Sequence, residues 1–240
     1  KELFSNSVVS RYDLCDALID GVLPKPVYKS GYVYLEKTAE ALEERIKKLN
    51  PNSKDYKDIV MITLGTGVGG GVVINNNILT GYNGGAGEIG HMHMNDTETD
   101  ICGCGRKGCL EQYASATGVV RLARRYMADN QDTKMTEFGD NITAKDVFDL
   151  AKEGDKGANV VVSQMGDYLG KAMSAVAVTI NPQAFIIGGG VSKAGQFLID
   201  AIKDTYRETC FAACGDAALH LAQLGNDAGM YGAAALVVNE

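Results

Sequence analysis

Five of the seven residues from Gly65 to Gly71 are glycine, and this stretch constrains the fold more than any other feature of the sequence. It follows the apolar run 58–64 and leads into Val72–Ile74, so the pattern predicts two strands joined by a glycine-rich turn. Its Gly-x-Gly-x-x-Gly spacing is only weak evidence for a nucleotide-binding motif. A dinucleotide fingerprint would open a helix here, and a Walker loop would need a lysine. Glycines let backbone N–H groups approach phosphate oxygens, so we favour a phosphate-binding turn over a plain flexible hairpin.

The hydrophobic periods along the chain predict helices alternating with strands, as in an α/β or α+β protein. The expected helices cover residues 34–50, 110–128, 144–152, 159–180, 193–206 and 228–238. The expected strands cover 58–64, 71–74, 78–80, 184–187 and 217–221, with a hairpin turn at Asn75–Asn77 and a loop at 81–109. A shift in composition near residue 57 separates the charged N-terminal segment from a glycine-rich core.

The charge of the chain argues against nucleic acid as a partner, because 23 Lys and Arg against 30 Asp and Glu leave a net charge of −7. The pair Arg124–Arg125 is expected on a solvated helical face. No apolar run reaches the length of about eighteen residues that a membrane helix needs, and the first residues have no signal-peptide core, so no membrane partner is expected. The use of cysteine favours a reducing cytoplasm.

Three cysteines and a histidine are crowded into the loop at 81–109. Cys102, Cys104 and Cys109 lie within eight residues, and His91 precedes them. Three thiolates and an imidazole suit tetrahedral zinc, and four protein ligands would leave no position for water, so the site would be structural. His93 is a rival ligand. The alternative is three independent buried thiols, which the crowding among glycines disfavours.

Two glutamates flank this cluster. Glu88 lies three residues before His91, and Glu111 lies two residues after Cys109. A metal link between the imidazole and the thiolates would bring the two carboxylates together, and neighbouring carboxylates suit hydrogen bonds to adjacent sugar hydroxyls. For Glu111 the alternative is a favourable charge in the first turn of a helix.

Five segments together resemble the ROK family of repressors and sugar kinases, and most of all its bacterial glucokinase branch. They are residues 64–71 (LGTGVGGG), 85–91 (GAGEIGH), 102–111 (CGCGRKGCLE), 181–191 (NPQAFIIGGGV) and 224–229 (LGNDAG). The resemblance covers residues 58–240, and its most specific part is the histidine and cysteine set with its flanking glutamates.

The resemblance implies an actin-like ATPase (ribonuclease H-like) α/β fold with a mixed sheet, flanking helices and a zinc-stabilised loop, in a cytoplasmic homodimer. It implies contacts to a hexose from Gly67, Glu88, His91 and Glu111. It implies structural Zn²⁺ held by His91, Cys102, Cys104 and Cys109. It places Gly65, Thr66 and Gly67 at the phosphates of ATP with Mg²⁺, and Gly188, Gly189 and Gly190 on the adenosine side.

Two motifs of the family are not found in this sequence: the Asp-x-Gly-Gly-Thr phosphate loop and the Asn-Asp-Ala-Asn segment, whose aspartate is the general base. Asn226-Asp227-Ala228 looks similar, but the family uses that segment elsewhere, so Asp227 is not assigned and the catalytic residue stays unknown. Residues 1–57 are therefore expected to be a shortened or atypical N-terminal lobe, or unrelated sequence. Residues 58–240 are expected to form the ATPase and sugar-binding domain.

The first functional hypothesis is ATP-dependent phosphorylation of a hexose at its 6-hydroxyl, as in a glucokinase. The second is a non-catalytic sugar-binding or regulatory module, because two motifs for the chemistry are missing. Its DNA-binding variant is the least favoured, since no helix-turn-helix stretch is visible. The third is a zinc-stabilised scaffold that pairs with itself. The sequence does not say which hexose binds.

Overall fold

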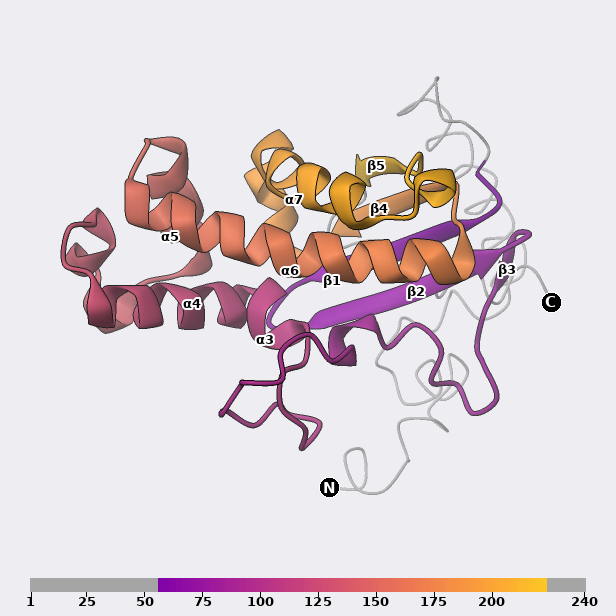
Figure 1. The fold of residues 1–240 in the computed structure, drawn as a ribbon, viewed down its shortest axis with the longest axis horizontal. Coiled ribbons are helices and arrows are strands. Elements are labelled where there is room, and N and C mark those ends of the chain that lie inside the picture. The colour runs from indigo at the N-terminus through magenta and orange to yellow at the C-terminus, as the bar shows by residue number, and fades with distance from the viewer. Residues whose placement is uncertain (1–55, 224–240) are drawn as a thin grey trace, which may run out of the picture. The chain divides into compact units, whose positions relative to one another are not determined.

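The computed structural model describes residues 56–223, whose five strands form one mixed sheet flanked by helices (Figure 1). The order of the strands is β3-β2-β1-β4-β5. They are β1 (Ile59–Leu64), β2 (Val68–Ile74), β3 (Asn77–Ile78), β4 (Ala184–Gly188) and β5 (Ala218–Leu221). The hairpin β1–β2–β3 is antiparallel, whereas β4 runs parallel to β1 and β5 parallel to β4. The mixed sheet is thus confirmed.

The glycine-rich stretch lies mostly inside a strand. Strand β2 begins at Val68, three residues before the expected start, and Gly69, Gly70 and Gly71 pair with β1. A Cβ on Gly70 would lie 2.2 Å from the carbonyl oxygen of Gly87 and so would clash with the loop that crosses the strand. Gly70 therefore permits close approach of two backbones, and only residues 65–67 form the turn.

The predicted hairpin turn at the far end of β2 is confirmed, although the returning strand is shorter than expected. Asn75 and Asn76 have φ angles of +49° and +63°, and Ile74 pairs with Asn77. Two central residues with positive φ define a type I′ turn, which asparagine tolerates better than most residues do.

The helix expected at 110–128 is two helices, because Ser115 interrupts it. Its backbone is extended and its hydroxyl oxygen accepts a hydrogen bond from Gly118 N, so the serine caps the second helix. The described α-helices are α3 (Glu111–Ala114), α4 (Ala116–Asp129), α5 (Ala144–Lys152), α6 (Lys156–Ile180) and α7 (Gln196–Thr209). Helix α6 begins three residues earlier than expected because Asp155 caps it, and it ends as predicted before Pro182.

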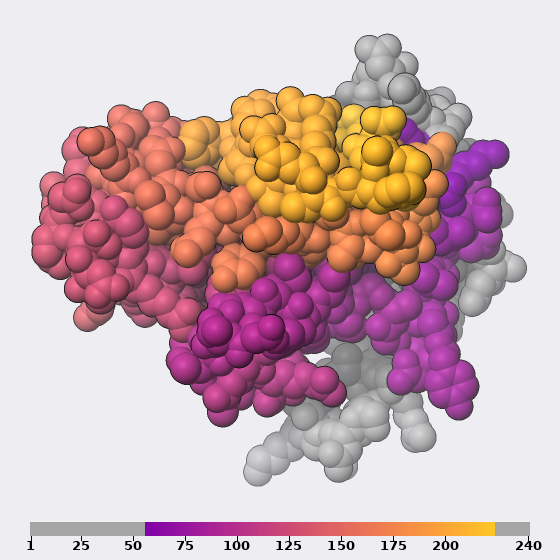
Figure 2. Space-filling model, in the orientation of Figure 1, coloured from indigo at the N-terminus to yellow at the C-terminus, as the bar shows by residue number. Residues whose placement is uncertain are grey.

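Helix α7 starts at Gln196 and not at residue 193, because a short 3₁₀ helix, Gly190–Ala194, comes first and Gly195 then turns the chain with φ of +74°. Helices α6 and α7 pack so closely that a Cβ on Gly166 would lie 2.1 Å from the carbonyl oxygen of Ala201. Both helices lie in front of the sheet in the ribbon view (Figure 1) and form the orange and yellow surface in the space-filling view (Figure 2).

The helices expected at 34–50 and 228–238 lie outside the described residues, and the domain boundary expected after residue 57 stays a prediction. Within residues 56–223, no helix has both the length and the apolar character to cross a membrane.

Candidate functional site

The structure brings the four predicted metal ligands together. One ligand atom each from His91, Cys102, Cys104 and Cys109 lies within 4.8 Å of the other three. The sulfurs of Cys104 and Cys109 are 3.5 Å apart, and Cys102 Sγ is 3.8 Å from His91 Nδ1. Zinc–sulfur bonds of about 2.3 Å require sulfur–sulfur distances of about 3.8 Å around a tetrahedral ion, so the donor set fits zinc with only small adjustments.

His93, the rival ligand, does not point at the thiols. Its Nε2 lies 2.8 Å from Asp96 Oδ1, and its Nδ1 lies 3.0 Å from the carbonyl oxygen of Lys107. The hydrogen bond to Asp96 raises the pKa of His93. With both ring nitrogens occupied, this imidazole stabilises the loop and leaves the ligand position to His91.

Backbone hydrogen bonds build the loop that carries the thiols. His93 pairs with Cys109 and Ile101 pairs with Lys107, so the chain doubles back on itself twice. Gly108 has φ of +74°, and a Cβ there would lie 2.1 Å from the carbonyl oxygen of Asn95. Glycine is therefore required at the point where the loop returns.

Two of the three thiols would need a bound cation in order to ionise at neutral pH. Burial raises the pKa of Cys102 to about 12 and also raises the pKa of Cys109, so both are protonated at neutral pH without a counter-charge. The backbone N–H of Arg106 lowers the pKa of the exposed Cys104. Only thiolates bind zinc well, so a bound cation would displace these protons.

Glu111 joins the cluster of His91 and three cysteines to the glycine turn, residues 65–67. Its Oε1 accepts a hydrogen bond from Cys102 Sγ at 3.0 Å and lies 3.9 Å from His91 Nδ1. Its Oε2 accepts a hydrogen bond from Val68 N at 3.4 Å, and a Cβ on Gly67 would lie 2.6 Å from the same oxygen. The absent side chain of Gly67 therefore makes room for this carboxylate.

Glu88 approaches the same histidine from its other nitrogen. Its Oε2 lies 4.0 Å from His91 Nε2, and its side chain is 67% exposed. The two glutamates thus flank one imidazole, as expected from the sequence. Glu111 also opens α3, so the predicted charge in a first turn is present as well.

A polar cavity of about 300 Å³ adjoins this group. Its walls come from the glycine turn, from the loop 101–109 that carries the three thiols (the thiol loop), and from the start of α4. They are formed by Thr66, Gly67, Ile101, Cys102, Gly103, Glu111, Gln112, Ser115, Thr117 and Arg121. The turn is attached to α4, because Ala116 N donates to the carbonyl oxygen of Gly65 at 2.8 Å and Thr117 Oγ1 donates to that of Thr66.

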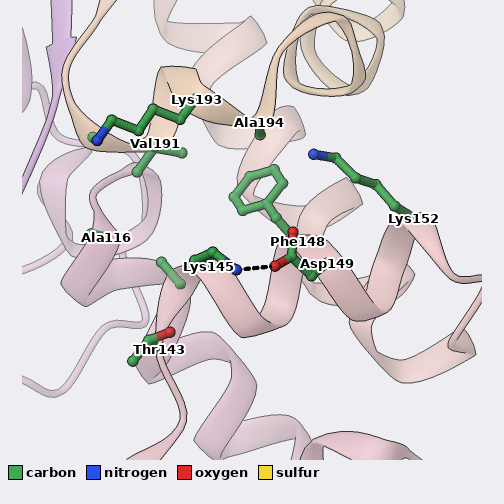
Figure 3. A pocket seen from close by; sticks show the side chains of 11 residues that line it. Ala116, Thr143, Lys145, Phe148, Asp149, Lys152, Val191, Lys193 and Ala194 are labelled. Carbon is green, nitrogen blue, oxygen red and sulfur yellow. Dashed lines mark hydrogen bonds and ion pairs between the residues drawn. The ribbon is translucent and has the colours of Figure 1, made fainter. Parts of the chain in front are cut away.

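A second cavity of about 420 Å³ lies on the other side of the start of α4, between α5 and the 3₁₀ helix after β4 (Figure 3). Phe148, Val191 and Ala194 form its apolar walls, and Lys145 forms an ion pair with Asp149 at its edge. Of the predicted adenosine residues only Gly190 lines it. Gly188 and Gly189 precede it at the end of β4.

Gly189 sets the direction in which the chain leaves β4. Its φ is +86°, and a Cβ there would lie 2.5 Å from the carbonyl oxygen of Leu64. This glycine therefore brings the end of β4 against the end of β1, next to the glycine turn. Thr66 and Gly67 line the first cavity and Gly190 lines the second. The residues predicted to contact ATP therefore lie on both sides of the first turn of α4.

A buried carboxylate beside the site was not expected from the sequence. Glu98 is 6% exposed, and it accepts two hydrogen bonds from Arg125, at 2.7 and 2.9 Å. Arg125 lies on an exposed face as expected, with 43% of its side chain accessible, but its guanidinium also pairs with the buried carboxylate of Glu98. The spacing of Arg121 and Arg125, one helical turn apart, was the only signal for it.

The stability of the protein is expected to fall in acid because of Glu98. The hydrogen bonds from Arg125 hold the pKa of Glu98 well below its ordinary value of 4.5. Its ionised form therefore stabilises the fold above about pH 4.5, and this contribution is lost as the pH falls further. Thermal melts between pH 7 and pH 3 should show Glu98→Gln about 10 °C less stable at pH 7, with the difference shrinking in acid. A constant difference would contradict this assignment.

The fold and the paired cavities define an α/β protein of the actin-like ATPase class, with a mixed sheet and flanking helices, as in the solved ROK kinases. The chain belongs to the ROK family, whose sequence pattern matches residues 33–240. The family match therefore begins upstream of residue 58, which is the residue at which the resemblance of the motifs begins.

Three similar proteins illustrate the range of the family. A glucokinase from Halalkalibacterium halodurans is 44% identical over 185 residues, which are 75% of this chain and 56% of the relative. A ROK family glucokinase from Streptomyces griseus, solved with glucose and AMPPNP, is 34% identical with a TM-score of 0.69, over 76% of this chain and 61% of that one. A ROK family transcriptional regulator, a homologue of the E. coli MLC protein, is 30% identical with a TM-score of 0.66, over 75% and 45%. The chain thus spans little more than half of the length of these glucokinases.

Proposed function

We propose that this chain carries the sugar and nucleotide sites of an ATP-dependent hexose kinase of the glucokinase type. The observation that carries the proposal is the position of Glu111, whose carboxylate lies 3.9 Å from His91 Nδ1 and accepts a hydrogen bond from Val68 N beside the glycine turn. A sugar held by this carboxylate would lie beside the phosphate-binding turn. That proximity is what transfer of the γ-phosphoryl group to the 6-hydroxyl requires.

In this mechanism Glu88, His91 and Glu111 hold the sugar hydroxyls, because carboxylates accept hydrogen bonds from adjacent hydroxyls. Thr66 and the backbone of Gly65 and Gly67 face the phosphates of ATP, whose Mg²⁺ neutralises developing charge. Phosphoryl transfer has a loose transition state, so positioning and electrostatic stabilisation supply most of the catalysis. The general base is not among the residues assigned to the site.

We propose structural zinc at the cluster of His91 and the three thiols. Four protein ligands complete a tetrahedral coordination, so the ion would serve to hold the loop and not to activate water. His91 Nδ1 faces the thiols while Nε2 faces Glu88, so one imidazole can bind the ion and still orient toward sugar. A homodimer and a cytoplasmic location are further proposals that follow from the family.

The apolar cavity beside Gly190 is the proposed position of the adenosine. Ala194→Phe would fill this cavity and should weaken ATP binding by about tenfold or more, with glucose binding unchanged. Calorimetry with each ligand separates the two effects, and Ala213→Phe, at an exposed alanine outside the cavity, is the matched control. Equal ATP affinity in the two variants would place the nucleotide elsewhere.

A coupled assay with ATP and a panel of hexoses tests the function, with calorimetry for each sugar alone. Turnover with glucose would support the glucokinase assignment. The absence of both turnover and sugar binding would refute the assignment.

Similarity to a transcriptional regulator favours a second candidate, a non-catalytic sugar-binding or regulatory module. Sugar binding without ATP turnover would support this candidate over the kinase.

A further inference from the structure

Glu98 is the most deeply buried carboxylate among the described residues, and its partners come from two helices of the candidate site. Beside the paired hydrogen bonds from Arg125 of α4, it accepts one from Tyr113 Oη of α3 at 2.7 Å. Its Oε1 also accepts from the backbone N–H groups of Thr99 and Asp100, at 2.9 and 3.0 Å. A carboxylate with five charge-assisted donors is held in one orientation.

The charges around Glu98 balance. Arg125 Nη2 also donates to Asp100 Oδ2 at 2.8 Å, and Arg121 Nη1 lies 3.7 Å from both Glu98 Oε2 and Asp100 Oδ2. Two guanidinium groups thus face two carboxylates. The loop at 95–100 is therefore fixed to α4 by ionic contacts that need no metal.

The same loop fixes α3. The carbonyl oxygen of Asp100 accepts from Gln112 Nε2 at 3.0 Å, and Gln112 Oε1 accepts from Cys109 N at 3.0 Å. Residues 111–113 therefore face three ways: Glu111 to the glycine turn, Gln112 to the thiol loop and Tyr113 to Glu98. Helix α3 has only four residues, too few to hold its own orientation, so these tertiary contacts must set it.

We propose that Glu98 is a positioning residue for the sugar-facing carboxylate Glu111, acting through Tyr113 and the Asp100–Gln112 contact. The inference rests on the proposed sugar site. The thiol loop holds α3 from one side through Cys109, and Glu98 holds it from the other. Zinc alone is therefore insufficient to place Glu111, and loss of Glu98 should loosen α3 while the ion stays bound.

The test compares wild type, Glu98→Gln and the milder Tyr113→Phe, which removes only one hydroxyl. Hydrogen exchange should become about tenfold faster at the amides of Cys109 and Val68, which donate to Gln112 and Glu111. The dissociation constant for sugar, measured by calorimetry on the folded protein, should rise about tenfold. Zinc content should stay at the wild-type level. In the double variant the changes in exchange rate and sugar affinity should be smaller than the sum of the two single effects, because both substitutions disrupt the same Tyr113–Glu98 hydrogen bond.

Glu137→Gln is the matched control, since this glutamate is exposed and distant in sequence from the site. A lower melting temperature with unchanged exchange at Cys109 and Val68 would reduce Glu98 to a stabilising ion pair and overturn the inference. If wild-type protein binds no sugar, the proposed function fails, and the exchange rates still decide whether Glu98 positions α3.

Discussion

Cys104→Ser protein is expected to purify with well under one equivalent of zinc and to melt about 10 °C below wild type. Cys104 is the exposed cysteine of the cluster, so serine fits there without creating a cavity, and the change removes little except the soft ligand. The three remaining ligands would bind the ion weakly. The buried Cys102 and Cys109 would then keep their protons, because burial raises the pKa of both thiols.

Elemental analysis and thermal melts with and without a chelator check this expectation. Chelation should lower the melting temperature of wild type and have little effect on Cys104→Ser. Cys214→Ser is the matched control, because this half-buried cysteine is not part of the cluster. Full zinc content in Cys104→Ser would show that the cluster is not the metal site.

The sequence was sufficient for features that depend on local chemistry. The type I′ turn at Asn75–Asn76, the end of α6 before Pro182 and the convergence of the four ligands all follow from residue types at short spacings. Where the same residue type serves two purposes, the sequence was ambiguous. Gly69 and Gly70 suggested a turn but lie in β2, and the reason for glycine at Gly70 is a loop that returns some twenty residues later.

Glu98 shows the other limit of the sequence. Nothing near it in the chain marks it as buried, because its partners Tyr113 and Arg125 are 15 and 27 residues away. The local sequence around Glu98 would fit an exposed glutamate as well as a buried one. Only the folded backbone brings α3, α4 and the 95–100 loop together, so long-range ionic contacts of this kind have to be observed.

Gly67→Ala is expected to weaken sugar binding by about 10- to 100-fold while the fold keeps its stability. The new methyl group would lie 2.6 Å from Glu111 Oε2, so the carboxylate must turn away and lose the hydrogen bond from Val68 N. A hydrogen bond from a sugar hydroxyl to this carboxylate would contribute about 1.5–3 kcal/mol, and its loss gives the stated range. The φ angle of Gly67 is not positive, so alanine adds no backbone strain. The lost hydrogen bond from Val68 N is long, at 3.4 Å, so stability should change by less than about 1 kcal/mol.

Gly71→Ala makes the same chemical change four residues further along the chain and is the matched control, because no atom of the described part of the chain lies within 4 Å of its added Cβ. Calorimetry with glucose and thermal melts on both variants separate loss of the site from loss of the fold. Glucose affinity should fall only in Gly67→Ala, while both proteins melt close to wild type. Equal affinities would mean that Glu111 does not contact the sugar, because among residues 56–223 no other side chain or backbone group lies so close to the added methyl group. The role of the glycine turn would then be confined to the phosphates, and the kinase proposal would lose the contact that places sugar beside nucleotide.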